Sequence, residues 1–282
     1  MTTLTSTGTV RNTVADSTTM LRRNLLHMVR YPGLTGFVIG IPVILLLMFV
    51  YVFGGTLGAG LSPDVIGVSA AGGGGGGGGA VQQYLAYVLP GILFIGIAGI
   101  ANGASIGVAM DMTEGIVARF RSMAISRTAV LTGHVLGNTI QGLLVSVILI
   151  GAALLMGLRP TASPLGWLGI AAIVALVSFA VSWLGVALGV SAKTVESASN
   201  TPMVLLLLVF LGSGFVPASS MPGWLQGFAQ YQPFTTFIET VRALMFGADP
   251  GLNLWLALGW AVLLGVVGYV WARTMYVRRS VR

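Results

Sequence analysis

The chain has 282 residues, of which 55% are hydrophobic and only 7% are charged. Soluble domains carry about 25% charged residues, so this composition excludes a water-soluble globule and indicates an integral membrane protein. The net charge of +7 would suit nucleic-acid binding, but the basic residues lie in short tails and loops between apolar runs, so we expect no nucleic-acid partner.

The first predicted element is a basic amphipathic helix over residues 17–31. Leu21, Leu25 and Met28 share one helical face. Its arginines are Arg22, Arg23 and Arg30. Such a helix buries its apolar face at the headgroup boundary and pairs its cations with anionic lipid, so membrane lipid is an expected partner. A simple charge cluster that orients the chain is the alternative interpretation.

Six later segments are long and apolar enough to cross about 30 Å of hydrocarbon as helices. They are residues 34–54, 84–110, 133–157, 165–191, 202–217 and 252–272. The fifth segment is short, and Pro202 suits the first position of a helix. The fold class predicted is therefore an all-α polytopic membrane protein with six transmembrane helices.

The distribution of lysine and arginine orients these spans, because cytoplasmic loops carry an excess of both. With the N-terminus inside, all 14 basic residues except Arg159 and Arg242 fall in inner segments. This distribution predicts an N-in, C-in protein of the plasma membrane. We expect three parts: a cytoplasmic tail with the interfacial helix (1–32), a six-helix transmembrane domain (33–272) and a basic cytoplasmic tail (273–282).

The first outer loop, residues 55–83, contains eight consecutive glycines from Gly72 to Gly79. Ordering such a run costs conformational entropy and buries no apolar area. We therefore expect a flexible outer tether, whose role the sequence leaves open. A phosphate-binding loop is disfavoured because the lysine and the serine or threonine that should follow the glycines are missing.

Inside the predicted spans, small and neutral polar residues replace charged ones. The central thirds contain no Asp, Glu, Lys or Arg, which argues against ion-coupled transport. Glycines spaced four apart predict close helix packing. They include Gly36 and Gly40, Gly99, Gly103 and Gly107, Gly133 and Gly137, and Gly185 and Gly189. Four polar residues in these spans either form hydrogen bonds between helices or line a substrate pathway. They are Asn102, Ser105, Asn138 and Gln141.

The inner loop after the second span, residues 111–123, predicts a short amphipathic helix. Asp111 and Glu114 resemble a capping arrangement at a helix start. Ile116, Phe120 and Met123 then fall on one apolar face. The segment is either a docking site for a soluble partner or a loop that only sets topology, and the residues themselves favour neither.

Three motifs lie in register with the six spans. The first is the inner loop with Glu114-Gly115 and Arg119-Phe120-Arg121-Ser122-Met123. The second is Tyr87-Val-Leu-Pro-Gly-Ile-Leu93, which enters the second span. The third is the stretch from Gln232 to Gly247 before the last span. Together these motifs resemble the ABC type-2 transporter permeases, in the branch of the daunorubicin and other drug-resistance exporters. The glycine run departs from the family pattern.

The resemblance implies partners and roles. It implies two permease copies, expected as a homodimer, and two copies of a cytoplasmic ABC ATPase that binds ATP and Mg²⁺. The inner loop would be the coupling helix that docks into the ATPase, formed by Glu114, Gly115, Arg119, Phe120 and Arg121. The segment 17–31 would be the connecting helix. Residues 218–247 would form short outer re-entrant helices in which Glu239 and Arg242 pair, or else a simple surface helix.

The chain itself lacks a nucleotide-binding motif, since its sole lysine, Lys193, follows no glycine-rich loop. We therefore expect no enzymatic activity, no catalytic residues, no cofactor and no metal site in this chain, with ATP hydrolysis in a partner. The predicted function is the permease subunit of an exporter of a hydrophobic or amphiphilic drug, lipid or lipid-linked glycan. The alternatives are an intramembrane enzyme, an ion-coupled carrier or channel, and a non-transporting scaffold.

Overall fold

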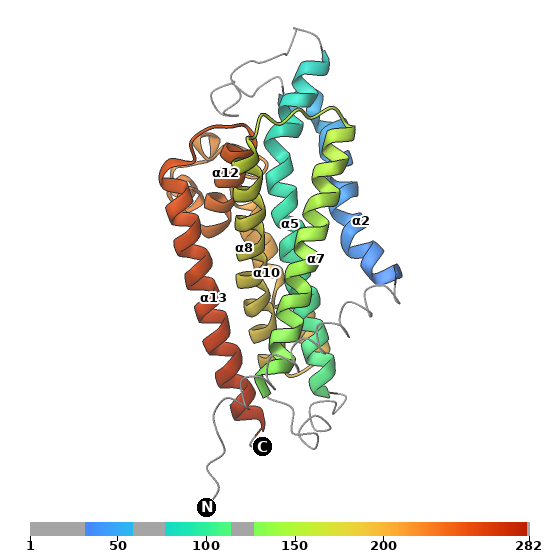
Figure 1. Ribbon diagram of the computed structural model, residues 1–282, viewed down its shortest axis with the longest axis vertical. Helices are drawn as coiled ribbons and strands as arrows, with labels where there is room; N and C mark the ends of the chain where they lie inside the picture. Colours follow the sequence, from blue (N-terminus) through green and yellow to red (C-terminus); the bar gives the residue numbers. More distant parts are fainter. Residues whose placement is uncertain (1–31, 59–76, 114–126, 281–282) are drawn as a thin grey trace, which may run out of the picture.

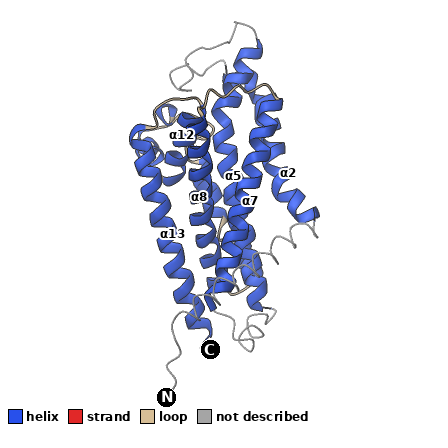
Figure 2. Cartoon of the chain, in the orientation of Figure 1, coloured by secondary structure: helices blue, strands red, loops and turns tan. Residues whose placement is uncertain are grey.

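The computed structural model describes residues 32–58, 77–113 and 127–280, and every regular element in these ranges is helical (Figure 2). Within these described ranges, five helical segments are long and apolar enough to cross a membrane. The first is α2 (Pro32–Met48), continued by a π-helical turn (Phe49–Phe53) and α3 (Gly54–Gly58). The others are α5 (Gly77–Thr113), α7 (Arg127–Leu155), α8 (Pro164–Ser191) and α13 (Gly251–Ser280).

The five long segments form an elongated bundle with α5 and α8 at its centre (Figure 1). We call the end where α5 begins the upper end and the end where α5 finishes the lower end, as in Figure 1. In the most apolar window of α5, 94% of the residues are buried, whereas the corresponding window of α13 is 17% buried. The apolar outer faces of α13 and α7 are left for lipid.

Short helices connect α8 to α13. They are α9 (Val195–Asn200), α10 (Met203–Phe210), a 3₁₀ turn (Ala218–Ser220), α11 (Gly223–Tyr231) and α12 (Pro233–Met245). The predicted fifth span, 202–217, is therefore not one membrane-length helix, since it is helical only over Met203–Phe210. Two glycines that favour non-helical conformations, Gly212 and Gly214, follow α10, where the chain turns.

Other predicted boundaries also shift. The predicted outer loop 55–83 is helical at both ends, because α3 continues to Gly58 and α5 already begins at Gly77. The last three residues of the glycine run are thus helical, and the tether prediction for the rest lies outside the described residues. At the other end of the chain, residues 273–280 of the predicted basic tail continue α13 as helix.

The glycine-mediated packing that the sequence predicts occurs mainly between α8 and α5. A Cβ atom added at Gly185 would overlap the carbonyl oxygen of Ala101, and one added at Gly189 would overlap that of Ser105. By contrast, a Cβ atom at Gly99 or Gly103 would meet no other described atom within 4 Å. Gly36 and Gly40 of α2 are equally open. Close backbone contact is therefore confirmed for α8, whereas the face of α5 that carries Gly99 and Gly103 has no close neighbour among the described residues.

Candidate functional site

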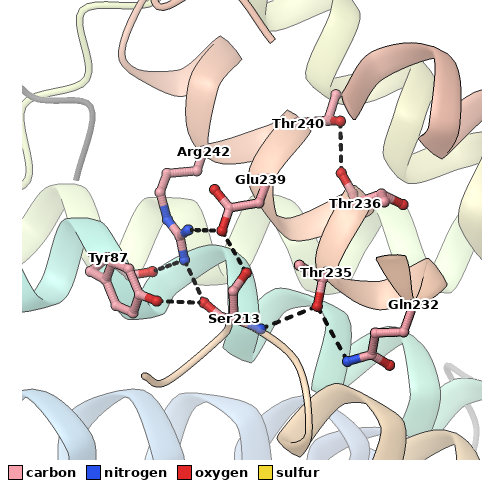
Figure 3. A network of polar contacts seen from close by, with 8 residues as sticks. All are labelled: Tyr87, Ser213, Gln232, Thr235, Thr236, Glu239, Thr240 and Arg242. Atoms are coloured by element: carbon pink, nitrogen blue, oxygen red, sulfur yellow. Dashed lines mark hydrogen bonds and ion pairs between the residues drawn. The ribbon is translucent and has the colours of Figure 1, made fainter. Parts of the chain in front are cut away.

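The helix α12, near the upper end of the bundle, carries the densest polar cluster among the described residues (Figures 1 and 3). Pro233 occupies its first turn, where the fixed φ of proline suits a helix start. Phe234, Phe237, Ile238 and Val241 are completely buried, and α12 packs against α5, α8 and α13. The alternative of a simple surface helix is therefore wrong.

Arg242 is the centre of this cluster and is only 3% exposed. Its Nη2 donates hydrogen bonds to the carbonyl oxygens of Tyr87 (3.0 Å) and Ser213 (2.9 Å). Its Nη1 pairs with Oε1 of Glu239 at 2.8 Å, as the i,i+3 spacing predicted. The guanidinium also lies 4.0 Å from the centre of the Tyr87 ring, a cation–π contact (Figure 3). One side chain thus joins α5, the turn after α10, and α12.

Ser213, in the turn after α10, makes the second set of hydrogen bonds in the cluster. Its carbonyl oxygen also accepts a hydrogen bond from the Tyr87 hydroxyl (2.8 Å), and its own hydroxyl donates to Oε1 of Glu239 (2.6 Å). Its backbone N–H donates to Thr235 Oγ1 (3.3 Å), which also accepts from the side-chain amide of Gln232 (3.2 Å). The turn at Ser213 is therefore attached to both ends of α12 and to α5 (Figure 3).

Glycine allows the turn to reach α5. A Cβ atom at Gly91 would lie 2.7 Å from both the Cα and the carbonyl oxygen of Gly214. Any larger residue at either position would separate the two backbones and stretch the bonds that Arg242 and Tyr87 make with Ser213. The apolar run 203–210 is therefore followed by Gly212-Ser213-Gly214. The close approach of Gly214 to Gly91 needs small residues, and Ser213 supplies the polar groups that bond to Tyr87 and Arg242.

The chemistry of this cluster is structural and electrostatic. Burying an isolated charge costs several kcal/mol, so an arginine that is 3% exposed must be hydrogen-bonded and paired, as Arg242 is. Glu239 is 32% exposed and keeps contact with the surroundings of the bundle. The described residues contain no group of three or more His, Cys, Asp or Glu that could hold a metal ion. The arrangement therefore fits a structural cross-link that holds α5, the turn after α10 and α12 together.

A second polar contact joins α5 and α7 at the lower end. His134 Nε2 lies 2.9 Å from Asp111 Oδ2, with side-chain exposures of 19% and 16%. The prediction that Asp111 caps the start of a new helix is wrong, because Asp111 lies in the last turn of α5. The pair joins α5 and α7 near the two helix ends that residues 114–126 connect in the sequence.

The four candidate pathway residues have different surroundings. Ser105 is completely buried, and its hydroxyl donates to the carbonyl oxygen of Ala198 (2.8 Å), which fixes α9 to α5. Asn138 is 9% exposed, and Gln141 is half-buried on α7. Asn102 of α5 is half-buried beside the exposed Gly103, and its buried Oδ1 has no hydrogen-bond partner within the described part of the chain.

The remaining predicted functional residues lie outside the described residues. They are the coupling residues Glu114, Gly115, Arg119, Phe120 and Arg121 and the interfacial arginines Arg22, Arg23 and Arg30. Sequence reasoning also missed Ser213 as a functional residue. The signal that would have revealed it is the Gly-Ser-Gly interruption at the end of an apolar run. Tyr87 and Arg242 are 155 positions apart in the sequence and belong to the second and third of the motifs described above. The structure brings these two motifs into contact.

The helices of membrane length and their lipid-exposed faces define a multi-pass integral membrane protein. A family model described as ABC-2 type transporter matches residues 17–246. The daunorubicin resistance ABC transporter permease protein DrrB1 of Streptomyces coeruleorubidus is 28% identical over 251 residues, which cover 87% of this chain and 82% of the relative. The probable doxorubicin resistance ABC transporter permease protein DrrC of Mycobacterium tuberculosis (strain ATCC 25618 / H37Rv) is 29% identical over 191 residues, which cover 62% of this chain and 68% of the relative.

The family match spans more than half of the sequence, and the chain belongs to the ABC-2 type transporter family. It is an ABC transporter permease and a multi-pass protein of the bacterial cell membrane. The resemblance inferred from the three motifs is therefore confirmed.

Proposed function

We propose that this chain is the membrane subunit of an ATP-driven exporter of hydrophobic or amphiphilic compounds, and that drugs are the first substrates to test. The observation that carries the proposal is the similarity to DrrB1, which extends over 87% of the chain and concerns a permease named for daunorubicin resistance. The apolar character of the five long helices fits a substrate that needs no fixed charge along its route. ATP and Mg²⁺ would be bound by two copies of a separate cytoplasmic ATPase.

We further propose six membrane crossings with both chain ends inside. Ser105 of α5 bonds to Ala198, and Tyr87 of α5 bonds to Ser213. At about 1.5 Å per residue, Ser105 and Tyr87 are about 27 Å apart along α5, close to the hydrocarbon thickness of about 30 Å. The segment from Ala198 to Ser213 extends over the same depth, which supports a sixth crossing made by α9, α10 and the turn that follows.

A cysteine placed in the glycine run 72–79 tests this topology, because the chain contains no other cysteine. A membrane-impermeant maleimide should label it in intact cells, since the run would lie outside. A cysteine placed in the inner loop 114–126 is the matched control and should react only after the cells are permeabilised. The reverse pattern would exclude the N-in, C-in arrangement.

The open face of α5 supports a pathway between two copies of the chain. Asn102 lies next to the exposed Gly103, and its buried Oδ1 has no hydrogen-bond partner within the described residues, which is costly unless another group supplies one. Gly99 and Gly103 on the same face would allow another backbone or a bulky substrate to approach closely. We propose that a second permease copy faces this surface and that the substrate passes between the copies by alternating access.

Coupling to the ATPase is proposed to run through residues 114–126, because α5 ends before this segment, α7 begins after it, and Asp111 and His134 join the two helices. Substitution of Phe120 by alanine would remove the largest apolar side chain of the loop and should lower export by about two- to thirtyfold, since coupling changes amount to about 0.5–2 kcal/mol. Transport into inverted vesicles, normalised to membrane-inserted protein, measures the effect. Ser122→Ala in the same loop is the control, and equal export by both variants would refute the assignment.

The whole proposal is tested by affinity capture of the tagged chain from its native membranes in mild detergent. The copurifying proteins are identified by mass spectrometry, and ATP hydrolysis is measured with and without vanadate. A stoichiometric ATPase with vanadate-sensitive turnover, stimulated by daunorubicin or doxorubicin, is the expected result. A chain that purifies without an ATPase would refute the exporter proposal and favour an ion-coupled carrier, a channel or a scaffold.

A further inference from the structure

The central helix α5 contains a proline in its interior. Pro90 lies well inside the helix, which nevertheless runs without interruption from Gly77 to Thr113. Because proline has no N–H group, α5 lacks the hydrogen bond that residue 90 would donate to the carbonyl oxygen of Ala86, and the proline ring crowds that oxygen. Gly91, which follows directly, is a residue of low helix propensity. Sharp helix bends occur mainly at prolines, so residues 89–91 are the place at which α5 bends most readily.

The turn after α10 contacts α5 on both sides of this proline. On the N-terminal side, the Tyr87 hydroxyl donates to the carbonyl oxygen of Ser213 at 2.8 Å. On the C-terminal side, Gly91 lies so close that a Cβ atom added to it would be 2.7 Å from Cα of Gly214. Arg242 completes the connection, because its Nη2 donates both to Ser213 O (2.9 Å) and to Tyr87 O (3.0 Å) (Figure 3). In an α-helix Tyr87 O is the acceptor for the N–H of Gly91, so Arg242 binds the carbonyl group that spans the proline.

The two sides of the proline also have different neighbours. The upper segment, residues 77–89, packs on α3, where a Cβ atom added to Gly54 would lie 3.4 Å from Cα of Val81. The lower segment, residues 91–113, has its closest backbone contact with α8, where a Cβ atom at Gly185 would overlap the carbonyl oxygen of Ala101. A bend at the proline would therefore separate two differently anchored bodies.

We propose that Pro90 is a hinge in α5 that the Arg242 cluster holds closed. While Arg242 and Tyr87 are bonded to Ser213, α5 moves as one rod. When these bonds break, residues 77–89 bend together with α3. The bonds are polar, and the carboxylate that pairs with Arg242, that of Glu239, is 32% exposed, so a polar group from outside the bundle can compete for it. In the exporter proposed above, on which this role depends, the bend moves the upper end of α5 while its lower end stays in place.

Distances between pairs of nitroxide labels test the hinge, because the native chain has no cysteine to remove. One label is attached at Gln82→Cys, an exposed position of the upper segment, and the other at Val262→Cys of α13, where the native side chain is 57% exposed. The control pair joins Met110→Cys, in the lower segment, to the same position of α13. Position 82 is about 12 Å from the proline along the helix, so a bend of about 20° moves its label by roughly 4 Å. Double electron–electron resonance in detergent measures both distances.

Two tyrosines of α5 provide a matched pair of variants. Tyr87→Phe removes only the hydroxyl that bonds to Ser213. Tyr84→Phe removes an equally buried hydroxyl that has no hydrogen-bond partner within the described residues. We expect Tyr87→Phe to broaden the distance distribution from position 82 toward a second population displaced by about 4 Å, and Tyr84→Phe to leave it unchanged. Arg242→Met should broaden it further. The distance from position 110 should stay constant in all three variants.

Pro90→Ala then assigns the motion to the proline, because alanine restores the missing N–H group. Combined with Tyr87→Phe, it should return the distribution from position 82 to the native width. A native distribution in Tyr87→Phe alone would show that the Arg242 cluster does not hold a hinge. Broadening that persists in the combined variant would place the motion elsewhere. These measurements need neither ATP nor an ATPase, so failure of the hinge is distinct from failure of the exporter proposal.

Discussion

Substitution of Arg242 by methionine is expected to destabilise the protein by about 3 kcal/mol, which corresponds to a fall in Tm of about 6–12 °C for a chain of this size. The variant loses the bonds to Tyr87 and Ser213 and leaves Glu239 without its cation. The expected loss lies at the lower end of the range for a broken buried pair, because Glu239 is 32% exposed and water reduces the penalty. Thermal unfolding in detergent, followed by size-exclusion chromatography, measures the change.

Two controls separate the ion pair from general effects of a lost arginine. Arg159→Met removes an exposed arginine at the same end of the bundle and should change stability by no more than about 0.5 kcal/mol. The double variant Glu239→Gln with Arg242→Met removes the stranded carboxylate and should recover part of the loss. A double variant as unstable as Arg242→Met would show that the pairing with Glu239 contributes nothing.

Substitution of Gly185 by alanine should be equally damaging, although it adds only one methyl group. The new Cβ atom would overlap the carbonyl oxygen of Ala101, which belongs to the backbone of α5 and cannot rotate away. The two central helices would have to separate, at a cost of about 3 kcal/mol. The same thermal assay measures this loss.

Gly99→Ala is the matched control, because Gly99 lies on α5 but meets no described atom within 4 Å of an added Cβ. Alanine is about 1 kcal/mol better than glycine inside a helix, so the stability of this variant should stay constant or rise. Equal losses at both positions would refute the argument from close packing. A loss at Gly99 alone would show that the open face of α5 is covered in the assembled permease.

The long helices could be predicted because twenty apolar residues without charge have few alternatives to a membrane helix. The spans around α5, α7, α8 and α13 were located to within several residues. The predicted fifth span was wrong as a single helix because its hydropathy stays high while Gly212 and Gly214 stop the helix. A run of apolar residues indicates that a segment is buried or faces lipid. It does not indicate whether the backbone forms a helix or a buried turn.

The candidate site was predictable only in part. The pairing of Glu239 with Arg242 follows from their spacing on one helix. The bonds from Arg242 to Tyr87 and Ser213 are long-range, and no local pattern specifies which carbonyl oxygens a buried guanidinium will bind. For the same reason the partner of Asp111 was missed, since His134 lies across the inner loop on another helix.

The backbone contact between α5 and α8 also has a mechanical meaning. Ala101 and Ser105 meet the glycines of α8 without any side chain between them, so this contact is a natural fulcrum for α5. From the midpoint of the contact, the arm to Tyr87 is about 24 Å long and the arm to Asp111 about 12 Å. A rotation of α5 about that point would move the Arg242 cluster about twice as far as the Asp111–His134 end, and in the opposite direction. The helix thus has the proportions of an unequal lever, in which a small displacement at the Asp111–His134 end becomes a larger one at the Arg242 cluster.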